Sequence, residues 1–187
     1  LKNRKLEEHQ IREILDHAIQ ESDRLQNLTE NVLLATRMDH ESGNLILQEI
    51  DFSELVKSQM NRWQRTHGQK RKFLTDVSVQ INIQADPNLL IALLNNLVDN
   101  AVKYSGENGE VKVSLSQDEV SVILRVSDNG LGIPEEEKSQ IFEKFYRSGN
   151  ESTRVHKGTG LGLYLVKSIA CLHDASVMLK NNTPQGA

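Results

Sequence analysis

Residues 89–105 constrain the fold more than any other stretch, because they predict a single helix with two different faces. At about 100° per residue, one broad face is apolar, which is typical of a helix packed on a core. That face carries Leu90, Leu93, Leu94, Leu97, Val98, Ala101 and Tyr104. The opposite stripe carries Asn96, Asn100 and Lys103 at spacings of four and three. Carboxamides can bind Mg²⁺ and donate to phosphate oxygens, and lysine supplies charge, so the stripe suits a metal–nucleotide complex. For this helix alone, a solvated polar face is the simpler interpretation.

Charge and cysteine content limit the partners and the compartment. The net charge of −4 and the pI near 5.9 argue against nucleic acid as a main partner, because a phosphate backbone demands clustered excess Lys and Arg. The single cysteine, Cys171, excludes an internal disulfide and favours a reducing compartment. We find neither a signal peptide nor an apolar run of the ~20 residues that cross a bilayer. We therefore expect a cytoplasmic chain without membrane contact, and leave open whether a longer parent is anchored in the cell membrane.

The first half of the chain predicts a long helix followed by mixed elements. Residues 6–40 contain no glycine or proline, and their apolar residues recur at alternating spacings of four and three. This stripe is too wide for a two-stranded seam, so it needs a partner chain or a further helix to bury it. We then expect a strand at 45–50, a helix that begins in the capping box Asp51–Glu54 and runs to about Arg65, and strand residues from 73 to 83.

The second half predicts a sheet covered by helices. Asp86 and Pro87 are a helix cap and a first-position proline, so they begin the striped helix described above. The later segments are each predicted from their periodicity: a hairpin of 111–115 with 120–126, a short helix at 134–146, a mobile loop at 147–157, a helix at 161–173 and a strand at 175–179. Helices on one side of a mixed sheet make an α/β sandwich.

Asp128 ends an expected strand and precedes a turn that contains Gly130 and Gly132. Glycines permit positive φ and let a flat ligand approach the backbone, while a carboxylate at a strand end accepts from an exocyclic amine. This pattern favours adenine, whose N6 donates, over guanine, whose O6 does not. An ordinary turn closed by an Asx cap is the alternative.

A second glycine segment, residues 158–162, opens the last expected helix. Unpaired N–H groups and the positive end of the helix dipole favour an anion there. The segment is neither the dinucleotide fingerprint nor a Walker loop, because Gly162 comes one residue early and no Gly-Lys-Ser/Thr follows. Before it, Phe142 and Phe145 are either core residues or the base of a lid. The cations around this lid suit phosphate, although each alone is an ordinary surface charge: Lys144, Arg147, Arg154 and Lys157.

Taken together, the four segments resemble, in order and interval, the N, G1, F and G2 boxes of sensor histidine kinases of two-component systems. The resemblance covers about residues 45–180 and implies an α+β fold, the two-layer α/β sandwich of the GHKL (Bergerat) ATP-binding domains. Residues 45–187 are then the ATP-binding catalytic domain. Residues 1–44 resemble the second helix of the family's helical-bundle dimerisation and phosphotransfer domain.

The resemblance also implies a site for ATP and Mg²⁺. Asn100 would be the principal Mg²⁺ ligand, Asp128 would bind the adenine amine, and the glycines of 158–162 would cradle phosphates and hinge the lid. The full set of expected ATP-binding residues is Asn96, Asn100, Lys103, Tyr104, Asp128, Gly130, Gly132, Ile133, Phe142, Phe145, Arg147, Gly158, Thr159, Gly160, Leu161 and Gly162.

The sequence departs from the family in two places. No His-Glu-x-x-Thr/Asn-Pro segment occurs, because His40-Glu41 lacks the proline, and His9 and His17 are expected to face solvent. We therefore expect no catalytic residue and no self-labelling in this chain. The histidine acceptor, the response-regulator aspartate and the homodimer belong to the parent. The family's strand after a terminal glycine is also missing, so we expect a weakened sheet edge. Two alternatives remain, a related GHKL ATPase or serine kinase and a nucleotide-free dimerisation module.

Overall fold

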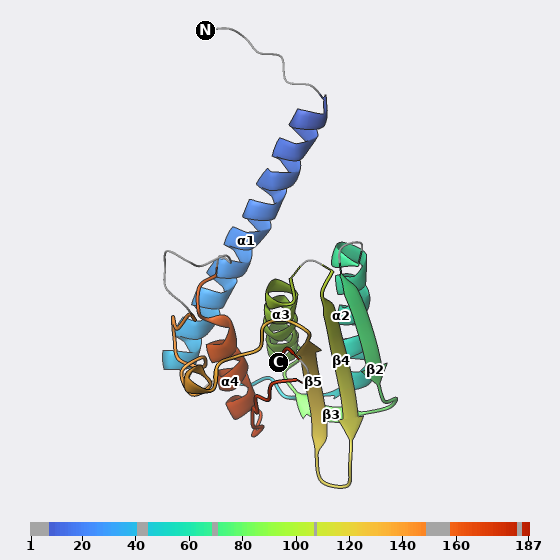
Figure 1. Cartoon of the computed structure of the whole chain (residues 1–187). Helices are drawn as coiled ribbons and strands as arrows, with labels where there is room; N and C mark the ends of the chain where they lie inside the picture. The colour runs from blue at the N-terminus through green and yellow to red at the C-terminus, as the bar shows by residue number, and fades with distance from the viewer. Residues whose placement is uncertain (1–7, 41–44, 69–70, 107, 149–157, 183–184) are drawn as a thin grey trace, which may run out of the picture.

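A computed structural model describes residues 8–40, 45–68, 71–106, 108–148, 158–182 and 185–187 (Figure 1). The elements in chain order are α1 (Glu8–His40), β1 (Gln48–Asp51), α2 (Phe52–His67), β2 (Lys72–Val77), β3 (Asn82–Ala85), α3 (Pro87–Tyr104), β4 (Glu110–Gln117), β5 (Val122–Asp128), the 3₁₀ helix η1 (Glu135–Glu137) and α4 (Gly162–Leu172). None of these helices is both long enough and apolar enough to cross a bilayer.

Strands β2, β4 and β5 form a mixed sheet that is covered by helices. β4 pairs parallel to β2 and antiparallel to β5, and β1 pairs with β3 in a separate antiparallel ribbon. Alternate residues of β4, namely Val111, Val113 and Leu115, are fully buried, as expected when one sheet face meets helices. Helices α2 and α3 lie together behind this sheet in Figure 1. The predicted α/β sandwich and the predicted hairpin are therefore confirmed.

Short-range caps begin both helices of this layer where the sequence predicts. Asp51 Oδ1 accepts from the backbone N of Glu54 at 2.9 Å. Asp86 Oδ1 accepts from the backbone N of Asn88 at 2.9 Å and of Leu89 at 3.2 Å, with Pro87 in the first turn. These carboxylates satisfy N–H groups that a helix start leaves unpaired. The backbone N of Asp86 also donates to His173 Nε2 at 3.0 Å, which fixes the start of α3 to the end of α4.

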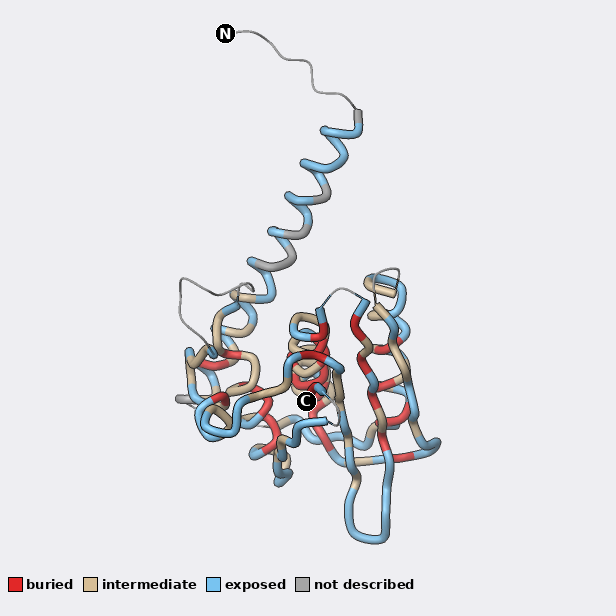
Figure 2. Tube along the Cα trace, in the orientation of Figure 1, coloured by how far each residue is buried: buried red, intermediate tan, exposed pale blue. Residues whose placement is uncertain are grey.

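Helix α1 packs against α4 of the sandwich through its C-terminal part. Ala35 is buried among Leu165 and Ile169 of α4, and Leu34 and Met38 pack against the same cluster. Farther towards the N-terminus the tube in Figure 2 is mostly exposed, and the apolar side chains of Ile11, Ile14, Leu15, Ile19 and Leu25 are among those left in water. His9 and His17 are exposed, as predicted. The described residues thus leave much of the apolar stripe of this helix in water.

Two predicted elements are wrong. Residues 134–146 form η1 and a run of turns in place of a helix, and Phe145 has a φ of 63°, a value that ends any right-handed helix. No strand occurs over 175–182, because its backbone has no strand partner among the described residues; the side chains of Asn181 and Asn182 bind the turn after β5 instead. Most of the predicted mobile loop, residues 149–157, lies outside the described residues.

Leu94 provides the test of this core. Its side chain on α3 is fully buried between α2 and β4, so Leu94→Ala leaves a cavity and should lower the free energy of unfolding by about 3 kcal/mol. Urea denaturation measures this change. Val120→Ala in the β4–β5 turn, where the side chain is 92% exposed, should change it by less than about 0.5 kcal/mol. Equal effects of the two variants would contradict the packing described here.

Candidate functional site

The polar stripe of α3 faces the glycine segment that begins α4. A Cβ added to Gly162 would lie 2.9 Å from Asn96 Oδ1 and 3.7 Å from Asn100 Nδ2. A Cβ added to Gly158 would lie 2.6 Å from Lys103 Nζ. A side chain at position 162 would press on the buried Asn96, whereas one at position 158 would meet only the flexible end of Lys103, which can move aside. The structure thus brings both carboxamides, the ammonium and the N-terminus of α4 together, although these residues are about sixty positions apart.

Asn96 is more enclosed than the sequence predicts. Its side chain is only 7% exposed, and its Nδ2 donates to the carbonyl of Ala92 at 2.9 Å. The carboxamides of Asn31 on α1 and Asn96 are paired by two hydrogen bonds. Asn31 Nδ2 donates to Asn96 Oδ1 at 3.5 Å, and Asn96 Nδ2 donates to Asn31 Oδ1 at 3.4 Å. Asn100 is half-buried. A helix outside the sandwich therefore contacts one end of the stripe.

Lys103 and Tyr104 lie at the opposite end of the stripe. Lys103 Nζ donates to the Tyr104 hydroxyl at 3.2 Å and lies 4.8 Å from the centre of the ring, a cation–π arrangement. Tyr104 is 45% exposed, so its predicted place on the core face is wrong for the ring. Its backbone carbonyl contacts the point at which Gly130 would carry a Cβ. The end of α3 is thus in direct contact with the first glycine turn.

The turn after β5 is held by Asp128. Its Oδ1 accepts from the backbone N of Gly130 at 2.8 Å, and Gly132 has a φ of 72°. Desolvation raises the pKa of Asp128, while hydrogen bonds from the backbone N–H groups of Gly130 and Ala187 oppose the shift. A carboxylate has two acceptor oxygens and can accept from more than one donor. Asp128 can therefore cap the turn, as one interpretation predicts, and also accept a hydrogen bond from an amine, as the other predicts.

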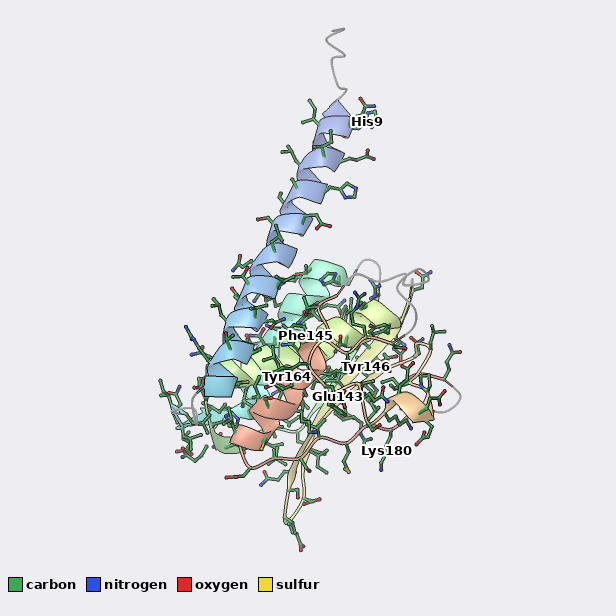
Figure 3. The ribbon with its side chains drawn as sticks, turned by 90° about the vertical axis from the view of Figure 1, so that its left-hand side faces the viewer. His9, Glu143, Phe145, Tyr146, Tyr164 and Lys180 are labelled. Atoms are coloured by element: carbon green, nitrogen blue, oxygen red, sulfur yellow. The ribbon has the colours of Figure 1, made fainter. Side chains whose placement is uncertain are left out.

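The segment with the two phenylalanines lies against the second glycine segment. The backbone N of Phe145 donates to the carbonyl of Gly160 at 3.0 Å, and a Cβ on Gly160, whose φ is 73°, would lie 2.6 Å from the carbonyl carbon of Phe145. Figure 3 shows Phe145, Tyr146 and Tyr164 near the start of α4. The Phe145 side chain is 68% exposed, whereas Phe142 is half-buried, with Lys167 Nζ 5.9 Å from its ring centre.

The remaining expected residues differ in what they can offer a ligand. Leu161 is 1% exposed and belongs to the core of α4, so only its backbone can serve a site. Thr159 Oγ1 accepts from the backbone N of Leu161 at 3.2 Å. Ile133 and Arg147 are half-buried, while Arg154 and Lys157 lie outside the described residues. Among the residues described, no group of three His, Cys, Asp or Glu is arranged to hold a metal.

Sequence reasoning missed three residues at this site. Asn31 reaches Asn96 from α1, and Asn181 and Asn182 reach the turn after β5 from the segment behind α4. None lies in a glycine motif or a periodic polar stripe. Their partners at α3 and at the turn after β5 are at least 48 positions away in the chain, so no local spacing could have indicated these contacts.

Comparison with known proteins agrees with this arrangement. The profile of the family of histidine kinase-, DNA gyrase B- and HSP90-like ATPases matches residues 85–187, which include α3 and both glycine turns. The sensor protein kinase WalK of Staphylococcus saprophyticus subsp. saprophyticus is 30% identical over 170 residues. That match covers 89% of this chain but 28% of WalK, so the chain spans less than a third of that relative.

Solved structures extend the similarity to the whole chain. Full-length ShkA in complex with AMPPNP is 28% identical, with a TM-score of 0.75, over 100% of this chain and 39% of that one. Histidine kinase ThkA, in complex with the response regulator protein TrrA, has a TM-score of 0.72 over 99% of this chain and 51% of that one. At 22% identity, ThkA shows a shared fold alone. The predicted resemblance to sensor histidine kinases is thus confirmed.

Proposed function

The chain belongs to the family of histidine kinase-, DNA gyrase B- and HSP90-like ATPases, and we propose that it is the ATP-binding catalytic part of a sensor histidine kinase. It would hold Mg-ATP and present the γ-phosphate to a histidine that lies outside these 187 residues. The parent would then pass the phosphate to an aspartate of a response regulator.

One observation carries this proposal. The carboxamides of Asn96 and Asn100 lie within 4 Å of the point where Gly162 would carry a Cβ, at the start of α4. Carboxamide oxygens suit the metal, and a helix N-terminus suits the phosphate oxygens. The nearby Lys103 suits the negative charge of the phosphates. Because residues 158 and 162 are glycines without side chains, phosphates can approach the backbone closely there.

Each residue then has a role that its chemistry supports. Asn100 would hold Mg²⁺, which supplies charge neutralisation on the phosphates when it is bound. Asp128 would accept the adenine amine, and Lys103 would face the phosphates. Phosphoryl transfer needs mainly positioning and electrostatic stabilisation, and such residues supply both without a nucleophile of their own. The chain contains no segment of the phosphoacceptor type, so the reacting histidine comes from elsewhere.

The partner proposal has two parts. The complex of ThkA with TrrA shows that a protein of this fold can bind a response regulator, and we extend this partner class to the parent of the present chain. The exposed apolar side chains on α1 support a homodimer of the parent, because a stripe of that kind is buried by further helices.

Nucleotide binding and self-labelling are the tests. Mg-ATP at 100 times its Kd should stabilise the chain by about 2.7 kcal/mol, seen as a thermal shift that shrinks when EDTA replaces Mg²⁺. With radiolabelled ATP, the chain alone should incorporate no acid-labile phosphate, but should label a separately supplied helical hairpin that carries the family's histidine. Absence of any shift with excess Mg-ATP would favour the dimerisation module. Acid-labile self-labelling would contradict the assignment of the acceptor to another segment.

A further inference from the structure

Two adjacent asparagines behind α4 hold both ends of the turn that follows β5. Asn181 binds the backbone of Ile133 at the far end of the turn, and Asn182 binds the backbone of Asp128 at its start. The residues between these two points include Gly130, which is buried, and Leu131, whose side chain is 86% exposed. The turn is therefore tied down through its backbone at its two ends.

Asn181 makes the pair of bonds that a neighbouring strand would make. Its Oδ1 accepts from the backbone N of Ile133 at 3.1 Å, and its Nδ2 donates to the carbonyl of the same residue at 2.9 Å. A residue in an antiparallel ladder exchanges the same two bonds with its opposite partner. One carboxamide thus makes with Ile133 both hydrogen bonds of an antiparallel backbone pair.

Asn182 restrains Asp128 in a complementary way. Its Nδ2 donates to the carbonyl of Asp128 at 2.9 Å, and the backbone N of Asp128 donates to the carbonyl of Ala187 at 2.9 Å. Gly186, which has a φ of 112°, accepts from the backbone N of Asn182 at 2.9 Å, and the Asp128 carbonyl occupies the place where Gly186 would carry a Cβ. Because these hydrogen bonds hold the backbone of Asp128, its carboxylate extends from a fixed position.

We propose that Asn181 and Asn182 are positioning residues for the nucleobase, which hold Asp128 and the glycine turn in the geometry that accepts adenine. This inference rests on the proposed function, because it needs the base to bind at Asp128. The two carboxamides contact the base turn, whereas the phosphates are assigned to α3 and the start of α4. Their loss therefore alters recognition of the base more than recognition of the triphosphate.

The test compares ATP with inosine triphosphate, which has the same phosphates but an oxygen where adenine carries its 6-amino group. In Asn181→Ala the Kd for Mg-ATP should rise about fivefold, as expected from hydrogen bonds that water partly replaces, and in Asn181→Ala/Asn182→Ala about tenfold. The Kd for inosine triphosphate should change less than twofold. Asn181→Asp keeps the acceptor for Ile133 N and removes the donor, so it should fall between wild type and Asn181→Ala.

Matched controls separate positioning from general destabilisation. Asn61→Ala, at an exposed asparagine on α2, should leave both affinities unchanged, and thermal melting should be recorded for every variant. The inference is overturned if both nucleotides weaken by the same factor, or if the variants keep the wild-type preference for ATP. A wild-type chain that binds neither nucleotide would instead refute the proposed function, so the two failures are distinguishable.

Discussion

Replacing Asn100 with alanine is expected to lower the rate of phosphate transfer to a supplied histidine hairpin by at least about 100-fold. Loss even of a group that only orients a metal ligand commonly costs 10- to 100-fold in metal affinity or activity, and Asn100 is assigned as a direct ligand. Its half-buried carboxamide lies beside the start of α4, where Asn96 also points. Titration of Mg²⁺ at fixed ATP should show the Mg²⁺ dependence of binding to be greatly weakened.

Asn95 gives a control on the same helix. Its Oδ1 accepts from Trp63 Nε1 at 3.3 Å, on the side that faces α2, so Asn95→Ala should reduce stability by about 1 kcal/mol and leave transfer almost unchanged. Alanine is a strong helix former, so α3 should persist in both variants. If Asn100→Ala retained wild-type Mg²⁺ dependence, the metal assignment would be wrong.

Asp128→Asn should raise the Kd for ATP about 10- to 100-fold, because a hydrogen bond to a charged acceptor contributes about 1.5–3 kcal/mol. The ionised carboxylate accepts from the adenine amine more strongly than the protonated acid does. Desolvation raises the pKa of Asp128, so ATP affinity should be full above that raised pKa and fall as the pH drops through it. Isothermal titration across this range measures the profile, and the variant should lose the Asp128 contribution.

The carboxyl group of Asp99 must be distinguished from that of Asp128 in this pH experiment. Desolvation raises the pKa of Asp99 to about 6, and the neighbouring Lys103 opposes the shift. Asp99 is unchanged in Asp128→Asn, so any pH dependence that persists in the variant belongs to Asp99 or other groups. Identical profiles for the wild type and the variant would contradict the role of Asp128.

The ionisation of Asp128 affects folding stability in the opposite direction to ATP binding. A raised carboxyl pKa means that the folded chain holds this proton more tightly than the unfolded chain does, so the contribution of Asp128 to the free energy of unfolding declines as the pH rises through its pKa. At neutral pH, Asp128→Asn should therefore be no less stable than wild type while binding ATP more weakly. Such a result would identify Asp128 as a residue kept for recognition and not for folding.

Local signals explain what could be predicted from sequence. The start of α3 follows from Asp86 and Pro87 alone, and the β4–β5 hairpin follows from alternation within eighteen residues. The parts of the candidate site were predicted from short motifs whose glycines and polar residues are separately recognisable, and from the resemblance of their order to that of a known family. The structure adds that these parts meet, which periodicity by itself cannot show.

The failures share one physical cause, which is that the deciding contact is distant in sequence. The alternation at 175–179 predicts a strand, but a strand needs a partner, and the described residues supply none for this segment. The contacts to the turn after β5 come instead from the side chains of Asn181 and Asn182, just beyond it. Residues 134–146 have helical composition, yet Phe145 adopts positive φ where its backbone bonds to Gly160. Asn96 is buried because α1, more than sixty positions earlier, lies across it.

Because α1 is packed against α4 near its C-terminal end, a tilt of this helix moves its distant end much more than its packed end. At 1.5 Å per residue, the rod extends about 40 Å from Ala35, its buried contact, to Glu8, whereas Asn31 lies only about 6 Å from the same pivot. If the rod tilts rigidly about Ala35, a displacement of about 5 Å at the distant end moves Asn31 by a little under 1 Å. The Asn31–Asn96 contacts are already 3.4 and 3.5 Å long, so a shift of this size breaks them. A tilt of this kind would therefore separate Asn96 from its partner on α1.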